Sequence, residues 1–459
     1  MKSDSESQLN MSYAGDDRFS KLLKSSSFFH MLEIHNTKNT AKEPQLKELL
    51  QCVANTAEIQ AMLIDDRLLD DGDDGAFEMV QNAIVTTGKS VVPVISGKDA
   101  MNDSAVSKLN KYRTANVRDF LAVTGNLLKA HRDGKAAIAP NEYTDSIKIL
   151  KIASESGDDN CTGVTVNPFK YTPEAQMAQY AKLMRKLNNG ASFIVSEAGW
   201  DMKKYQELLW FLKCRNIMRP LVARIMLWNS ESAIAQSTPG VPVPMKIASM
   251  DGDHDAILET TAMVAIGCRH LGYSGVVFAG IENAKTLNEL TAKIHELESL
   301  YPNYSLWCNE WSRRFMESSL LPYSEVLAKQ PPFYLYGALM NPDIIEYEPT
   351  EARPAMQNIK PPLLKDKIQA KVSSTNLPSW MKTTAGKITG SMPEDADYLA
   401  PCFGISNTEC PKRLVLGPCG GSSVDGSCEC ETQQPCFFDR IIRLAVASNQ
   451  IDFIEDATE

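Results

Sequence analysis

Eight short apolar runs alternate with amphipathic stretches along the first 280 residues of the chain. The runs are almost continuously hydrophobic, a pattern typical of strands buried on both faces of a parallel sheet. The stretches between them carry apolar residues at helical spacing. We therefore expect strands at residues 28–34, 59–65, 91–96, 119–125, 163–167, 192–197, 221–227 and 275–280.

Eight buried strands separated by helices indicate an α/β fold, a (β/α)8 TIM barrel, over residues 20–330. An open, doubly wound sheet would show the same alternation, so the count of eight is what favours the barrel. The glycine fingerprint of a dinucleotide-binding fold is also absent after the first run. Residues 1–19 form a polar N-terminal tail in this interpretation.

Two further segments follow the expected barrel. Residues 331–400 are rich in proline and are interpreted as a linker or as extended chain wrapped on the barrel. Wrapping is favoured because Phe333, Tyr334, Tyr336 and Trp380 would be poorly placed in water. Residues 401–459 hold six of the 11 cysteines and indicate a separate small domain.

The charge and hydropathy of the sequence argue against some classes of binding partner. The formal charge is −10, and no basic patch interrupts it, which argues against nucleic acid and anionic membranes as partners. The sequence shows neither a secretory signal nor an apolar stretch of about 18 residues. We therefore expect a cytoplasmic protein whose cysteines are reduced.

Polar side chains mark the ends of the expected strands, where the active sites of (β/α)8 barrels lie. Carboxylates in such a partly dry mouth are expected to have raised pKa values, which suits a general acid. Glu33 is the strongest candidate, because an unpaired carboxylate inside an apolar run would be costly. The alternative for each residue is a helix cap or a position facing solvent. The strand-end residues are Glu33, Asp65, Asp66, Ser96, Lys98, Thr124, Asn126, Asn167, Ser196 and Glu197, and Arg224 is a further candidate inside the seventh run.

Three phrases in the barrel region stand out: RDFLAVTGN at residues 118–126, VTVNPF at 164–169 and NGASFI at 189–194. In this order and spacing they resemble methylenetetrahydrofolate reductase. The resemblance implies a (β/α)8 barrel carrying a flavin, FAD or FMN, which passes a hydride to the methylene group of a reduced folate.

The resemblance also implies roles for individual residues. Glu33 matches the family's acid, which protonates the folate so that its imidazolidine ring opens. Asn126 stands where the family usually has an Asp near the flavin and the pterin, and Glu197 stands where it usually has a folate-contacting Gln. The expected cofactor-binding residues are Asp66, Ser96, Lys98, Thr124, Gly125 and Asn167.

The chain departs from the family's pattern at two further points. Of the Phe-Phe-Pro-Pro-Lys run that follows the family's acid, only Lys38 is retained. In the third strand, Val94 replaces a histidine that many members place next to the cofactor. The residues expected around the flavin therefore match the family's pattern less closely than the residues that form the fold.

Four cysteines of the tail, Cys410, Cys419, Cys428 and Cys436, are separated by eight, eight and seven residues beside glycine-rich turns. Four thiolates suit tetrahedral zinc or an iron–sulfur cluster, and the alternative is a set of reduced, buried cysteines. The order Cys-Pro-Lys, Gly-Pro-Cys-Gly-Gly, Gly-x-Cys-Glu, Cys resembles the C-terminal domain associated with a subset of methylenetetrahydrofolate reductases. Zinc is our first choice and an iron–sulfur cluster the alternative. Cys402 and Cys430 are extra thiols that could replace a ligand or act as redox groups.

The leading hypothesis is an oxidoreductase that interconverts methylene- and methyl-tetrahydrofolate, or a related pterin, through a flavin. Glu33 would act as the acid, and Asn126 and Glu197 would hold the pterin. Two alternatives stay open: a methyltransferase that binds a methyl-pterin without flavin, and a non-catalytic subunit of an electron-transfer complex. A protein electron donor and a homo-oligomer are both compatible with the sequence.

Overall fold

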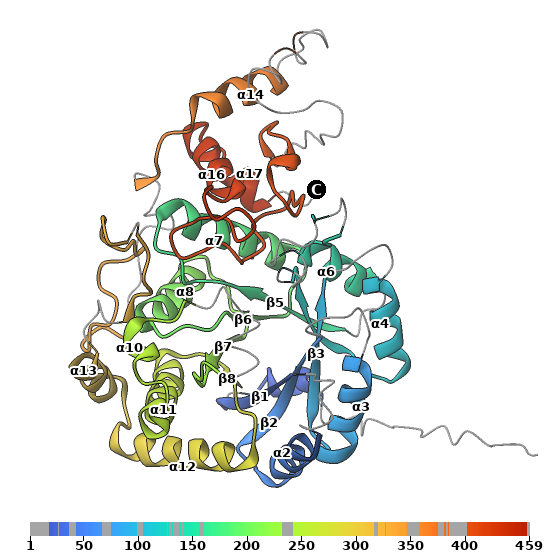
Figure 1. Ribbon diagram of the computed structural model, residues 1–459, viewed down its shortest axis with the longest axis vertical. Coiled ribbons are helices and arrows are strands. Elements are labelled where there is room, and N and C mark those ends of the chain that lie inside the picture. The colour runs from blue at the N-terminus through green and yellow to red at the C-terminus, as the bar shows by residue number, and fades with distance from the viewer. Residues whose placement is uncertain are drawn as a thin grey trace, which may run out of the picture.

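The computed structural model describes residues 18–25, 27–35, 43–66, 75–98, 104–125, 127, 131, 137–138, 142–155, 160–231, 242–315, 320–325, 327–346, 358–374, 381, 384 and 402–456. Eight parallel strands close into a barrel in sequence order, and β8 pairs with β1 (Figure 1). This confirms the predicted (β/α)8 fold class. The strands are β1 Phe29–His35, β2 Ile59–Asp65, β3 Ser90–Ser96, β4 Asp119–Val123, β5 Cys161–Val166, β6 Phe193–Ser196, β7 Leu221–Met226 and β8 Gly275–Ala279.

Helices surround the barrel and bury their apolar residues against the strands or, as α13 does on α11, against a neighbouring helix. Several begin at a side chain that accepts a backbone N–H, as Asp201, Asp253 and Asn283 do for α8, α11 and α12. None of the described helices is long and apolar enough to cross a membrane. The helices of this layer are α2 Glu43–Asn55, α3 Gly75–Thr87, α4 Ser104–Thr114, α6 Ser146–Glu155, α7 Pro173–Asn188, α8 Met202–Cys214, α10 Met245–Ala248, α11 His254–Leu271, α12 Ala284–Leu300 and α13 Tyr304–Arg314.

A short helix, α1 (Phe19–Leu22), lies at the end of the barrel where the strands begin. Phe19 is fully buried and makes edge-to-face contacts with Phe29 and Phe193, which also face the barrel interior. Its backbone N–H donates to Asp119 at the start of β4. Residues 18 and 19 of the segment expected to be a polar tail therefore contact the barrel, and residues 1–17 lie outside the described part.

The proline-rich segment packs against the barrel, as expected for a wrapping segment. The Tyr334 hydroxyl donates to Asp201 at 2.7 Å, and the backbone N–H of Leu335 donates to the buried Glu207 at 2.5 Å. Leu335 and Tyr336 are buried in the main core. The segment also contains a helix that its sequence did not predict, α14 (Leu364–Ser374), and Trp380 lies outside the described residues.

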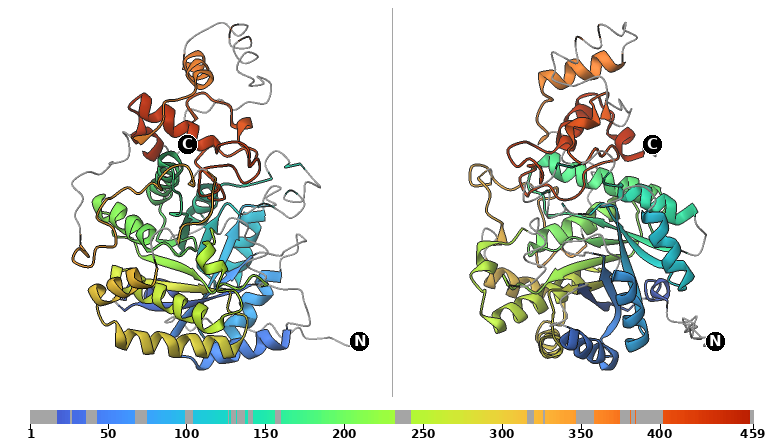
Figure 2. Two further views of the ribbon diagram at one scale, coloured as in Figure 1. Left: turned by 60° about the vertical axis from the view of Figure 1, so that its left-hand side comes forward. Right: turned by 45° about the vertical axis from the view of Figure 1, so that its right-hand side comes forward.

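The cysteine-rich tail lies over α7 at one side of the barrel (Figures 1 and 2). Both of its helices, α16 (Phe437–Ala447) and α17 (Ile451–Asp456), pack against α7. A short 3-10 helix, η5 (Asn407–Glu409), precedes them. Because α7 is covered by the barrel on one side and by the tail on the other, even its charged side chains are mostly buried. The tail therefore shares a buried interface with the barrel.

Candidate functional site

The carboxyl ends of the strands open into one cavity, whose empty space is about 1020 Å³ when the part open to solvent is included. Eight of the predicted catalytic and cofactor residues line it, and the ninth, Asn126, lies outside the described residues. These eight come from the ends of six strands, β1 to β6, so the closure of the barrel brings them together. They are Glu33, Asp66, Ser96, Lys98, Thr124, Gly125, Asn167 and Glu197.

Arg224 of β7 holds two of the predicted carboxylates. Its Nε and Nη2 donate to the two oxygens of Glu33 at 2.5 and 2.8 Å, and its Nη1 donates to Glu197 at 2.5 Å. The Glu33 side chain is 3% exposed, whereas that of Glu197 is 29% exposed. The bidentate pair is therefore buried, and the second pair lies at the wetter side of the cavity.

This pairing corrects one expectation. Burial alone would raise the pKa of Glu33, but the charge and hydrogen bonds of Arg224 outweigh it, so the pKa lies below its ordinary value. The prediction of a raised pKa is therefore wrong for Glu33. The sequence placed Arg224 inside the seventh strand but gave no sign of this partner, because β1 and β7 come near each other only through barrel closure.

Asp66 is a carboxyl whose pKa is raised, as expected for this cavity. Burial raises its pKa despite the charges of Lys108 and Lys98. Its Oδ2 accepts the backbone N–H of Ser96 at 2.8 Å, whereas its Oδ1 is buried without a hydrogen-bond partner in the described part of the chain. An unsatisfied buried oxygen in a cavity wall is a candidate contact for a bound molecule.

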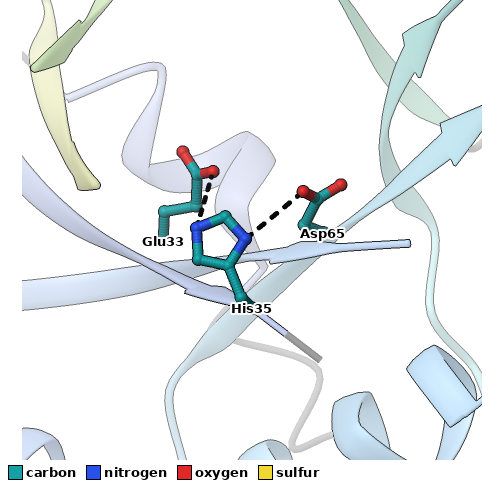
Figure 3. Close-up of side chains that lie close together, drawn as sticks. All are labelled: Glu33, His35 and Asp65. Atoms are coloured by element: carbon teal, nitrogen blue, oxygen red, sulfur yellow. Dashed lines mark ion pairs between the residues drawn. The ribbon is translucent and has the colours of Figure 1, made fainter. Parts of the chain in front are cut away.

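His35 lies between Glu33 and Asp65, and Figure 3 shows its ring bridging the two carboxylates. Its Nε2 is 3.3 Å from Glu33 Oε1, and its Nδ1 is 3.4 Å from Asp65 Oδ2. Among the described residues this is the one group of three metal-ligand types whose atoms lie within 4.8 Å of one another. Because Arg224 already occupies both oxygens of Glu33, its positive charge opposes a metal ion here.

Two residues of α7, Gln179 and Lys186, also line the cavity and were not singled out from the sequence. The Lys186 ammonium donates to the Thr165 carbonyl at 2.6 Å. Burial, with the nearby charge of Lys182, lowers the pKa of Lys186 to about 7. Their seven-residue spacing puts both on one face of the helix, but nothing local distinguishes that face from the others.

The tail supplies the last part of the wall: Pro418, Cys419, Gly420 and Gly421 line the same cavity. Sequence reasoning treated the tail as a separate unit and missed this contact. No local pattern reports such docking, because residues about 250 positions apart meet in it. The barrel site is therefore incomplete without the tail.

The four predicted metal-binding cysteines line a second, smaller cavity within the tail, which we call the thiol centre. Cys430 lines it too, whereas Cys402 is buried elsewhere and contacts the Val415 carbonyl. Burial and the neighbouring Glu429 raise the pKa of Cys419 to about 12. No three of these sulfurs lie within 4.8 Å of one another in the described structure. The donor set fits a soft metal group, but the sulfurs lie farther apart than the ligands of a single ion.

Comparison with known families gives two matches. The model described as methylenetetrahydrofolate reductase matches residues 18–276, which is more than half of the chain. The model described as methylene-tetrahydrofolate reductase C terminal matches residues 399–459. No curated protein matches the chain.

Solved structures give more distant similarities. An uncharacterized protein from Clostridium thermocellum, which binds two copies of 5-methyl-5,6,7,8-tetrahydrofolic acid, is 12% identical with a TM-score of 0.43, covering 62% of this chain and 99% of that one. Tryptophan synthase from M. tuberculosis, in its aminoacrylate- and BRD0059-bound form, is 11% identical with a TM-score of 0.35, covering 60% and 96%.

Proposed function

Because the chain belongs to the methylenetetrahydrofolate reductase family, we propose that its barrel binds a reduced folate, or a related pterin, and interconverts the methylene and methyl forms with a bound flavin. One observation carries the proposal. The described site residues, selected from the expected strand ends and from the family resemblance and scattered from position 33 to position 197, line a single cavity at the carboxyl ends of the strands.

The cavity residues fit a flavin, FAD or FMN. The unsatisfied Oδ1 of Asp66 and the side chains of Lys98 and Asn167 offer polar contacts for a ring edge or a phosphate. Gly125 has a positive φ of 89°, and a Cβ there would collide with Ser96 Oγ, so the backbone can approach a ligand closely. A flavin, when bound, supplies the hydride chemistry, and the chain's own residues bind, orient and move protons.

Proton transfer is assigned to the carboxyls of the cavity. Opening of the folate's imidazolidine ring needs a proton, and the family resemblance gives this role to Glu33. Arg224 favours the ionised form of Glu33, so the bound folate has to loosen that pair before Glu33 can carry a proton. Asp66, with its raised pKa, is the second carboxyl in the cavity able to hold one. Glu197 and Asn126 are proposed to hold the pterin.

The test is the absorption spectrum of the purified protein together with oxidation of methyltetrahydrofolate by an artificial acceptor. We expect a flavin spectrum and turnover, and Glu33→Gln should abolish turnover without unfolding the chain. Glu58→Gln is the matched control, because this exposed carboxylate precedes β2 at the opposite end of the barrel. A protein with neither flavin nor turnover would refute the proposal. A colourless protein that still binds the folate would favour the methyltransferase alternative.

For the tail we propose a metal group held by Cys410, Cys419, Cys428 and Cys436, with Zn as the first choice and an iron–sulfur cluster as the alternative. The convergence of these thiols on one cavity supports the proposal. Elemental analysis of the preparation that gives the flavin spectrum distinguishes zinc from iron.

A further inference from the structure

One loop of the tail belongs to both cavities. Residues 417–422, which we call the mouth loop, place Pro418, Gly420 and Gly421 in the wall of the barrel cavity and Ser422 in the wall of the thiol centre. Cys419 lines both. The barrel ligand and a group at the thiol centre would therefore share one wall.

Buried lysines of α7 and of the loop before it fix the mouth loop to the barrel. Lys170 donates to the Gly420 carbonyl at 3.3 Å and to the Ser422 carbonyl. Lys182 donates to the Gly417 carbonyl at 3.2 Å. Both lysines are almost completely buried, so water cannot easily replace these contacts.

Polar contacts also run between the tail and the strand ends. Lys412 of the tail donates to the Gly125 carbonyl at 3.0 Å and to Glu429 at 2.6 Å. Asn167, which lines the barrel cavity, donates to the Gly420 carbonyl at 3.0 Å. Movement of the mouth loop therefore disturbs the residues proposed to bind the cofactor.

Metal geometry gives the thiol centre a means of moving this loop. Tetrahedral zinc with Zn–S bonds of about 2.3 Å holds its sulfurs about 3.8 Å apart. A metal held by Cys419 and the other thiols of this centre would therefore fix the position of the Cys419 sulfur. An iron–sulfur cluster would equally set the position of Cys419. Either group therefore acts on the mouth loop through that residue.

We propose that the mouth loop is a ligand-binding wall of the barrel cavity and that metal loading of the thiol centre sets its position. The affinity of the barrel for a reduced folate then depends on the metal, although the metal does not contact the folate. The identity of the ligand rests on the proposed function, whereas the coupling rests on the shared wall.

The test uses the full chain and 5-methyltetrahydrofolate as the probe, with Kd measured by calorimetry and metal content by elemental analysis. Cys428→Ser removes a thiol that lines the thiol centre but not the barrel cavity. Cys52→Ser is the control, because this half-buried thiol lies far from both cavities, beside Asn288 of α12. We expect Cys428→Ser to lose metal and to bind the folate at least tenfold more weakly with unchanged circular dichroism, and Cys52→Ser to match the wild type.

A folded Cys428→Ser chain that has lost its metal and keeps the wild-type Kd would overturn the proposal. If that variant unfolds, hydrogen exchange of the native wild type decides. Bound folate should slow exchange of the amides at 419–421, and unchanged rates would overturn the proposed wall. A wild-type chain that binds no folate would instead refute the proposed function, and this inference would fall with it.

Discussion

The buried pair between Arg224 and Glu33 allows a quantitative test of the site. Arg224→Met removes the guanidinium and keeps an unbranched side chain of moderate length. Glu33, 3% exposed, is then left as a buried carboxylate without its bidentate partner. Breaking a buried ion pair by removing one partner costs about 3–5 kcal/mol. The partly exposed pair with Glu197 adds at most about 1 kcal/mol.

The stability lost in Arg224→Met should depend on pH in a definite direction. In the wild type the pKa of Glu33 is lowered, so this carboxylate stabilises the fold above the unfolded value of about 4.3, and that contribution is lost as pH falls through the folded pKa. Without Arg224, burial raises the pKa of Glu33, so its charged form destabilises the fold at neutral pH. That penalty disappears as pH falls and Glu33 takes up a proton. The gap between variant and wild type should therefore be largest near pH 7 and shrink toward pH 5.

Urea denaturation at pH 7 and pH 5, followed by circular dichroism, measures this gap. The double variant Glu33→Gln/Arg224→Met is the control, because it removes the charge together with its partner, and it should recover most of the stability lost in Arg224→Met. The reasoning is refuted if the double variant is as unstable as the sum of the two single variants, or if the gap is the same at both pH values.

Three further predictions concern other parts of the chain. Burial lowers the pKa of Lys186 to about 7, so its charged form lowers the stability of the fold below the unfolded pKa of about 10.4. Lys186→Met should therefore resist urea better than the wild type at pH 6, and this advantage should fade by pH 10. Equal urea curves for the two proteins at both pH values would contradict this. Gly267→Ala places a Cβ against the buried Trp307 ring and should lower the free energy of unfolding by about 1–3 kcal/mol, and wild-type stability would show that the ring has room to move. Chelation of the tail metal should lower the thermal midpoint of the full chain, since binding energy at such sites is folding energy, and an unchanged midpoint in a demetallated sample would argue against a metal at the thiols.

The barrel could be predicted because its signal is local. Continuous apolar runs report burial on both faces, and the count of eight selects closure, so the observed strands differ from the expected ones by only a residue or two at each end. The same logic placed Glu33, Asn167 and Glu197 at the mouth, because strand ends share one rim. β5 begins at Cys161, earlier than expected, since it pairs with Asp119 of β4.

The Arg224–Glu33 pair and the docking of the tail depend on contacts between distant parts of the sequence, which no local sequence pattern predicts. Arg224 meets Glu33 only when β7 and β1 come to the same mouth, so the lowered pKa of Glu33 could not be read from its neighbours in sequence. The mouth loop reaches the barrel cavity only because α16 and α17 dock on α7. Lys170 and Lys182 look like ordinary surface lysines in the sequence, yet both are buried beneath that loop.

The structure of the full chain with bound 5-methyltetrahydrofolate tests the central claim most directly. The account predicts the pterin at the carboxyl ends of the strands, in contact with Glu197 and covered by the mouth loop. A pterin bound elsewhere, such as the hollow between α11 and α12 beside Arg269 and His295, would contradict the account.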